Sequence, residues 1–314
     1  MIPAYRNPLV PNRADPYIVY EDRRYWFTAS VPEYDRIEIR SALTIPELAS
    51  AKPVTVWAKH PDGPMSANVW APELHRIDGK WYIYFAAGRV GAIFDIRNYV
   101  LENPAADPTS GTWTERGLLQ TQWDSFALDA TSFAVGGQRY LIWAQRDPAI
   151  ASNSNLYISA TAKPWTLRGP QVRISQPELD WECIGFRVNE GPAVLVRQGR
   201  VFVSYSASAT DANYCLGLLS AAAGSNLLDP ASWRKSQEPV FQTSPNNRQF
   251  GPGHNSFTVA EDGVTDLLVY HARNYREIEG DPLWNPDRHT RVQALRWRSD
   301  GTPDFGQPVA DGVQ

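Results

Sequence analysis

The sequence is poor in cysteine and has no long apolar run. Cys183 and Cys215 are its two cysteines among 314 residues. Two thiols cannot build a disulfide framework, and no Cys/His cluster has the spacing of a zinc site. Every uncharged apolar stretch is far shorter than the ~18 residues that a membrane-spanning helix needs. These absences exclude a disulfide scaffold, a structural zinc module and an integral membrane protein, so we expect no membrane partner.

A surplus of positive charge is also missing. The chain has 30 Lys and Arg residues against 34 Asp and Glu residues, a formal net charge of −4. Binding to nucleic acid is therefore not expected, because little cationic charge is available to displace phosphate counterions. Glycine-rich nucleotide loops and the G-x-S-x-G serine motif are absent as well.

For the oligomeric state of the protein, we expect a monomer.

The chain start, Met1–Arg6, lacks the apolar segment of a secretory signal. We therefore expect a cytoplasmic protein. A processed mature chain would have the same start, so secretion remains the alternative.

Aromatic and turn-forming residues are abundant: 12 Trp, 14 Tyr, 11 Phe, 21 Gly and 25 Pro. Short aromatic and β-branched runs alternate with Gly, Pro, Asn and Asp, and almost no stretch has helical periodicity. This pattern is typical of many short antiparallel strands. We predict an all-β protein with few helices.

An internal repeat specifies the architecture. Five segments of the chain each consist of a predicted turn followed by an aromatic or apolar strand. The aligned positions of these segments are spaced by 57, 58, 62 and 65 residues and are Tyr25, Tyr82, Tyr140, Phe202 and Leu267. A further short apolar strand precedes most copies, so each unit opens with a hairpin. Five units of about 60 residues account for nearly the whole chain. We predict one five-bladed β-propeller domain over residues 1–314.

An ionisable residue precedes each predicted hairpin, 9 to 13 residues before the aligned position: Asp15, Glu73, Asp129, Glu190 and His254. Equivalent positions of a propeller converge at one mouth of the central channel, where like charges are costly unless a ligand or a reaction uses them. Two convergent carboxyls suit glycoside hydrolysis, one as acid and one as base. A third carboxylate would hold the proton on the acid. The alternative is a set of structural acids that cap turns or bind a stabilising cation.

Six segments around these positions carry a family resemblance. They are Arg13–Pro16, Val69–Leu74, Leu128–Ala130, Val188–Pro192, Gly253–Asn255 and Tyr270–Arg273. In this order and at blade spacing they resemble glycoside hydrolase family 43, whose members are five-bladed propellers that invert the anomeric carbon. The resemblance implies that Asp15 is the general base, that Glu190 is the general acid, and that Asp129 tunes the acid and holds the substrate.

The same resemblance implies contacts around the sugar. Trp70 would line the sugar pocket and Arg273 would contact the substrate. Glu73 matches a family motif and is a candidate substrate-binding residue, with a structural hydrogen-bonding acid as the alternative. His254 would lie near an axial cation, calcium or another, held through water. No cofactor is expected for the chemistry itself.

The segments Tyr34–Ile39 and Trp181–Glu190 are most similar to family members that release terminal α-L-arabinofuranose. We therefore expect an exo-acting α-L-arabinofuranosidase acting on arabinan or arabinose-containing oligosaccharides. A β-D-xylosidase, an endo-arabinanase and a non-catalytic sugar-binding propeller are the alternatives. The joint presence of Asp15, Asp129 and Glu190 argues against the binding module, because a lectin needs no acid and base pair.

Arg146–Pro148 and Trp181–Cys183 resemble motifs of the retaining fructoside hydrolases of family 32, which share the fold. Their positions argue against that assignment. Asp147 follows the second strand of its unit, and Glu182 lies eight residues before Glu190.

Overall fold

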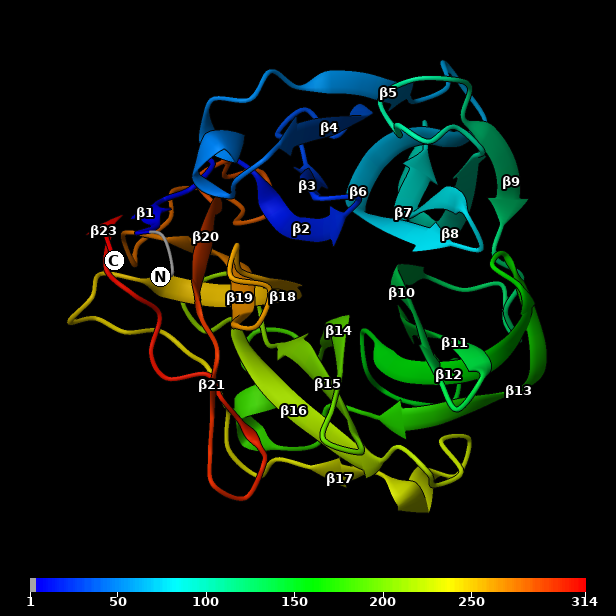
Figure 1. Cartoon of the computed structure of the whole chain (residues 1–314). Helices are drawn as coiled ribbons and strands as arrows, with labels where there is room; N and C mark the ends of the chain where they lie inside the picture. Colours follow the sequence, from blue (N-terminus) through cyan, green and yellow to red (C-terminus); the bar gives the residue numbers. More distant parts are fainter. Residues whose placement is uncertain (1–3) are drawn as a thin grey trace.

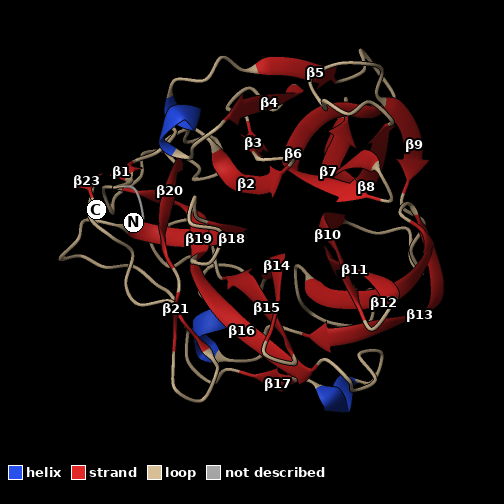
Figure 2. Ribbon diagram, in the orientation of Figure 1, coloured by secondary structure: helices blue, strands red, loops and turns tan. Residues whose placement is uncertain are grey.

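The computed structural model describes residues 4–314 as five β-sheet blades around a central axis (Figure 1). Its helical content is three short 3-10 helices on the periphery (Figure 2): η1 (Pro46–Ala49), η2 (Asp180–Glu182) and η3 (Pro230–Ser232). The predicted all-β, five-bladed propeller is confirmed. Met1–Pro3, the first residues of the predicted domain 1–314 and of the Met1–Arg6 segment, lie outside the described residues.

Blades 1 to 3 are four-stranded and antiparallel, with strands in chain order from the axis outward. Blade 1 contains β2 (Ala14–Glu21), β3 (Arg24–Ser30), β4 (Arg36–Ala42) and β5 (Val54–Ala58); blade 2 contains β6 (Pro64–Ile77), β7 (Lys80–Arg89), β8 (Ala92–Asn103) and β9 (Thr114–Leu118); blade 3 contains β10 (Ala127–Val135), β11 (Gln138–Gln145), β12 (Asn155–Lys163) and β13 (Thr166–Ser175).

Blade 4 is also four-stranded, whereas blade 5 has three strands, and short strand pairs complete the fold. Blade 4 contains β14 (Asn189–Arg197), β15 (Arg200–Ala207), β16 (Cys215–Ala222) and β17 (Arg234–Lys235); blade 5 contains β18 (Phe250–Val259), β19 (Asp266–Arg273) and β20 (His289–Ala294); the pairs are β21 (Arg296–Trp297) with β22 (Pro303–Asp304) and β1 (Arg6–Asn7) with β23 (Gly312–Val313).

The aromatic segments that revealed the repeat are the second strands of the blades, β3, β7, β11, β15 and β19. Their side chains fill the spaces between neighbouring sheets. The rings of Trp26 in β3 and Trp81 in β7, for example, meet edge to face with centroids 5.8 Å apart. Alternation along each second strand thus buries apolar groups on both faces of its sheet.

The N-terminal segment closes the propeller by covering the outer edge of blade 5. Asn7 is buried, and its side chain both donates to the carbonyl of Val292 and accepts from its N–H, at 2.8 and 2.9 Å. These bonds satisfy backbone groups on β20 that a fourth strand would otherwise pair. Separately, no helix within residues 4–314 has the length and apolarity to cross a membrane.

Candidate active site

The first strand of every blade contains a β-bulge, where two of its residues face one residue of the second strand. The first residue of each bulge, called the bulge residue here, has a positive φ. The left-handed conformation costs roughly 1 to 2 kcal/mol for a residue other than glycine. Bulges re-aim side chains and are frequent beside active sites. The pairing of β6 and of β18 is also irregular nearer the start of each strand, where Met65 (φ 60°), Asn68 (49°) and Gly251 (60°) have positive φ. The bulge residues considered below, each from the last bulge of its strand, are Asp15 (φ 54°), Ala71 (46°), Asp129 (58°), Gly191 (54°) and His254 (43°).

Four of these bulges are tied to the preceding blade through the backbone N–H of the bulge residue. Each N–H donates to a side chain of the neighbouring sheet, which helps to offset the local strain. The bonds are Asp15 to His271 Nδ1 (3.1 Å), Ala71 to Ser30 Oγ (2.8 Å), Gly191 to Asp129 Oδ2 (2.9 Å) and His254 to Ser206 Oγ (2.7 Å).

The bulges correct the predicted phase of Glu73. Ala71 is the bulge residue of blade 2, and Glu73 follows it by two positions. The Glu73 carboxylate is buried with Oε2 2.8 Å from Nε2 of His75, and it is not among the described residues that line the cavity below. The predicted equivalence was wrong because spacing counted along the chain does not reveal where a bulge inserts its extra residue.

Asp15 is held as a carboxylate in the centre of the propeller. Its Oδ2 accepts a 2.6 Å hydrogen bond from Ser30. Its Oδ1 lies 3.3 Å from Nδ1 of His254, 3.4 Å from Nδ1 of His271 and 3.5 Å from Nη1 of Arg288. Burial raises the pKa of Asp15, but the charges of His254 and Arg288 outweigh burial, so this pKa lies well below its ordinary value. Asp15 is thus ionised and suited to accept a proton.

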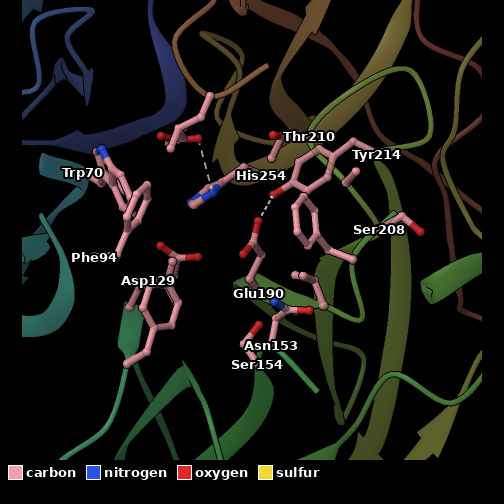
Figure 3. A pocket seen from close by; sticks show the side chains of 18 of the residues that line it. Trp70, Phe94, Asp129, Asn153, Ser154, Glu190, Ser208, Thr210, Tyr214 and His254 are labelled. Atoms are coloured by element: carbon pink, nitrogen blue, oxygen red, sulfur yellow. Dashed lines mark hydrogen bonds and ion pairs between the residues drawn. The ribbon is translucent and has the colours of Figure 1, made fainter. Parts of the chain in front are cut away.

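Glu190 precedes the bulge residue Gly191 by one position, so its predicted phase was also wrong, yet it lines the same cavity as Asp15. Burial raises the pKa of Glu190, while a 2.8 Å hydrogen bond from the Tyr214 hydroxyl to Oε1 acts in the opposite direction. The net direction is upward, which favours the protonated acid. Figure 3 shows Tyr214 and Glu190 meeting in the cavity.

Asp129 points into this cavity beside Glu190 (Figure 3). Burial is the main cause that raises the pKa of Asp129 to about 7, and the negative charges of Glu190 and Asp15 act in the same direction. Asp129 and Glu190 therefore titrate as a coupled pair with an increased affinity for protons.

His254 places positive charge among the three carboxyls. Burial lowers the pKa of His254, but Asp15, Asp129 and Glu190 outweigh burial and raise it above its ordinary value. With Arg288 also cationic, two positive groups face Asp15 and the Asp129–Glu190 pair. When that pair holds one proton, the charges of the site balance, which suits a neutral substrate.

The surroundings of His254 do not favour direct metal coordination. Residues 4–314 contain no group of three or more His, Cys, Asp or Glu side chains that could hold a metal ion. A protonated imidazole also offers no lone pair to a cation. The axial cation implied by the family resemblance therefore stays a prediction that involves intervening water.

The three carboxyls and His254 lie in one cavity of about 410 Å³. Trp70 forms part of its wall and packs edge to face against Tyr34, with ring centroids 5.9 Å apart. Phe94 from β8 and Phe126 and Phe186 from loops add aromatic surface. A polar floor under aromatic walls is a typical lining for a small polar ligand.

Arg273 and Arg288 have different places in this site. Arg273 is buried outside the cavity lining, and its guanidinium donates to the carbonyls of Thr210 and Pro282 and to Oδ1 of Asn285, each at 2.8 Å. It thereby connects two loops that shape the cavity. Arg288 lines the cavity itself and donates to the Tyr34 hydroxyl at 2.7 Å.

Sequence reasoning missed Arg288 and Tyr214. Both lie in loops or strand ends outside the repeat, so no spacing pointed to them. One indirect signal existed for Tyr214: Gly253, in the Gly253–Asn255 motif, lies where a Cβ atom would collide with the Tyr214 ring. A glycine beside a site residue can mark such a close approach.

The residues of the family 32 resemblance have structural contacts. Glu182 is fully buried and its carboxylate accepts hydrogen bonds from Asn189, Tyr205 and Lys235. Asp147 accepts a 2.8 Å hydrogen bond from Tyr157. Within residues 4–314, neither of these two carboxylates is among the groups that line the central cavity.

Comparison of the sequence with known proteins identifies the family of this chain. The profile described as "Glycosyl hydrolases family 43" matches residues 5–303. The extracellular exo-α-(1→5)-L-arabinofuranosidase of Streptomyces avermitilis is 58% identical over 310 residues, which cover 98% of this chain and 64% of that protein. α-L-Arabinofuranosidase 43 of Humicola insolens matches with the same identity and coverage. The chain thus spans about 64% of the length of these two relatives.

Among solved structures, an α-L-arabinofuranosidase from Lactobacillus brevis superimposes with a TM-score of 0.96 at 56% identity, covering 98% of each chain. A xylan β-1,4-xylosidase from Bacillus halodurans has a TM-score of 0.75 at 20% identity, covering 97% of this chain and 58% of that one. The latter likeness concerns the fold alone. With a family profile matched over almost its whole length, the chain belongs to glycosyl hydrolase family 43.

Proposed function

We propose that this chain is an inverting, exo-acting α-L-arabinofuranosidase that removes terminal arabinofuranose from arabinan or related oligosaccharides. The observation that carries the proposal is the divergence of two pKa values in one cavity: that of Asp15 is lowered and that of Glu190 is raised. Carboxyls separated in this way can act at the same pH as base and acid.

In the proposed reaction Asp15 accepts a proton from water as the water oxygen attacks the anomeric carbon. The glycosidic carbon–oxygen bond breaks, and Glu190 gives its proton to the departing oxygen. Asp129, whose charge opposes ionisation of its neighbour, keeps the shared proton on Glu190 and accepts hydrogen bonds from the sugar. Arg288 replaces Arg273 as the proposed arginine contact, because its guanidinium lies in the cavity wall.

The choice of arabinose is supported by the two relatives at 58% identity, both named as arabinofuranosidases, and by the L. brevis enzyme. The exo mode is supported by the printed name of the S. avermitilis relative. The same name describes an extracellular enzyme, which favours the secreted alternative over the cytoplasmic expectation for this chain.

The decisive test is release of nitrophenol from 4-nitrophenyl α-L-arabinofuranoside and, separately, from the β-D-xylopyranoside. We expect the arabinoside to be hydrolysed and the Asp15→Asn variant to lose this activity. Proton NMR of the first product should show the inverted anomer. Preferred hydrolysis of the xyloside would favour a β-D-xylosidase. Activity on arabinan alone would favour an endo enzyme, and binding without hydrolysis a sugar-binding propeller.

A further inference from the structure

A second hollow of about 530 Å³ lies beside the catalytic cavity, between blades 2 and 3. We call it the lateral groove. It is lined by Phe94, Asp95, Arg97, Ser125, Phe126, Arg146, Asp147, Pro148 and Ile150. Phe94, Phe126 and Arg146 line the catalytic cavity as well, so the two spaces are continuous along one wall.

Arg146 is the polar residue at this junction. Its side chain is exposed, and within residues 4–314 its guanidinium makes no ion pair or hydrogen bond. The turn that carries it is fixed, because Asp147 is buried and accepts hydrogen bonds from Tyr157 and from the N–H of Ala149, each at 2.8 Å. Up to five N–H donors are thus presented on a rigid turn at the boundary of the two spaces.

The remaining charges of the groove are compensated within the protein. Arg97 pairs with Asp95 at 2.9 Å and with Asp124 at 2.7 Å. Phe94 is 53% exposed and supplies an apolar face at the entrance. Exposed aromatic surface with free donors and little net charge matches a neutral polyol with apolar ring faces, such as a sugar, better than an anionic ligand.

We propose that the lateral groove binds the sugar units on the leaving side of an α-arabinooligosaccharide, with Arg146 at the first of these positions. The inference rests on the proposed function. An enzyme that removes a terminal unit leaves the whole remaining chain on the leaving side, so substrate contacts beyond the catalytic cavity belong to that part. The groove offers this part of the substrate a path, because it shares Phe94, Phe126 and Arg146 with the catalytic cavity.

The test compares kcat/KM for arabinobiose, arabinotriose and arabinotetraose with that for 4-nitrophenyl α-L-arabinofuranoside. For the unmodified protein we expect kcat/KM to rise about fivefold or more from the disaccharide to the tetrasaccharide, as one or two added hydrogen bonds or stacking contacts would give. Ile150→Trp, which fills the groove, should reduce this rise to less than about twofold. Arg146→Ala should reduce it too, and this exposed side chain can be removed without disturbing the core.

Val264→Trp is the matched control, because Val264 is 81% exposed in the hairpin between β18 and β19. It should keep the full dependence on chain length. A protein that hydrolyses every substrate but shows no such dependence would overturn the groove and leave the proposed function standing. A dependence that persists in both groove variants would also overturn it. Absence of hydrolysis on all substrates would overturn both proposals.

Discussion

The hydroxyl of Tyr214 donates a 2.8 Å hydrogen bond to Oε1 of Glu190. The phenol ring is parallel to the imidazole of His271, with centroids 5.7 Å apart, and it fills the space left by the missing side chain of Gly253. Tyr214 is therefore fixed by its own neighbours, and through this bond it fixes the orientation of the Glu190 carboxyl.

Replacing Tyr214 by Phe should change both the rate and its pH dependence. Loss of the hydroxyl removes an interaction that lowers the pKa of Glu190, so this pKa should rise. The alkaline limb of kcat/KM, which reports the acid, should then move to higher pH, with a drop of about tenfold at the optimum. Tyr5→Phe is the control, because it removes a 2.8 Å bond to Glu261 outside the cavity. An unchanged alkaline limb in Tyr214→Phe would contradict the role.

Glu190→Gln should discriminate between leaving groups. Without its acid the enzyme should lose about 10²- to 10⁴-fold in kcat on arabinooligosaccharides, whose departing alkoxide needs a proton. Activity on 4-nitrophenyl α-L-arabinofuranoside should fall much less, because nitrophenolate leaves without protonation. Steady-state kinetics on both substrates measure the difference. Equal losses on the two would remove Glu190 from the acid role.

Arg288 and Arg273 should have separable effects. Arg288 lowers the pKa of Asp15, so Arg288→Ala should move the acid limb of kcat/KM to higher pH and reduce activity by about 100-fold. Arg273→Ala should weaken the loops it connects, and so lower the melting temperature and raise KM without moving the acid limb. The pH profiles and melting curves of the two variants test this contrast. A shift of the acid limb in Arg273→Ala alone would reverse the assignment.

The propeller could be predicted because its second strands carry a strong local signal. Tyr25, Tyr82 and Tyr140 lie in aromatic strands that both neighbouring sheets bury, so the pattern recurs once per blade whatever the loop lengths. The predicted phase of the site residues was less successful. Glu73 was aligned with Asp15 by its distance from the second strand, whereas a bulge at Ala71 moves it off the cavity wall.

Arg288 could not be predicted for a different reason. Its place beside Asp15 depends on the path of the long loop between β19 and β20. Arg273 fixes part of that loop through the carbonyl of Pro282 and connects it to the carbonyl of Thr210, which is distant in sequence. Such contacts leave no periodic trace. The motif around Arg273 was visible, but it identified a residue that supports the wall instead of one that forms it.

The predicted axial cation should affect stability more than chemistry. The proposed reaction uses Asp15 and Glu190 without a metal, and the cation would be held through water. Exhaustive chelation should therefore leave hydrolysis of the aryl arabinoside largely intact, while the melting temperature falls by a few degrees and recovers with calcium, as mass action requires for a bound ion. An unchanged melting temperature would argue against the cation. Loss of the aryl activity would show that the chemistry depends on it.

Glu182 should matter for folding and not for the chemistry. Its buried carboxylate lies 2.7 Å from Nζ of Lys235, and although burial raises its pKa, hydrogen bonds from Lys235 and from backbone N–H groups bring the net pKa below its usual value. Glu182→Gln leaves Lys235, within residues 4–314, with only the 4.0 Å ionic contact to the exposed carboxylate of Glu178 and should lower the free energy of unfolding by about 3 kcal/mol in urea titrations at neutral pH. The stabilisation is present above the unfolded-state pKa and is lost as the pH falls through the lower folded-state pKa. The gap between the two proteins should therefore narrow in acid. A gap that widens there, or a selective loss of turnover in a fully stable variant, would contradict the structural role.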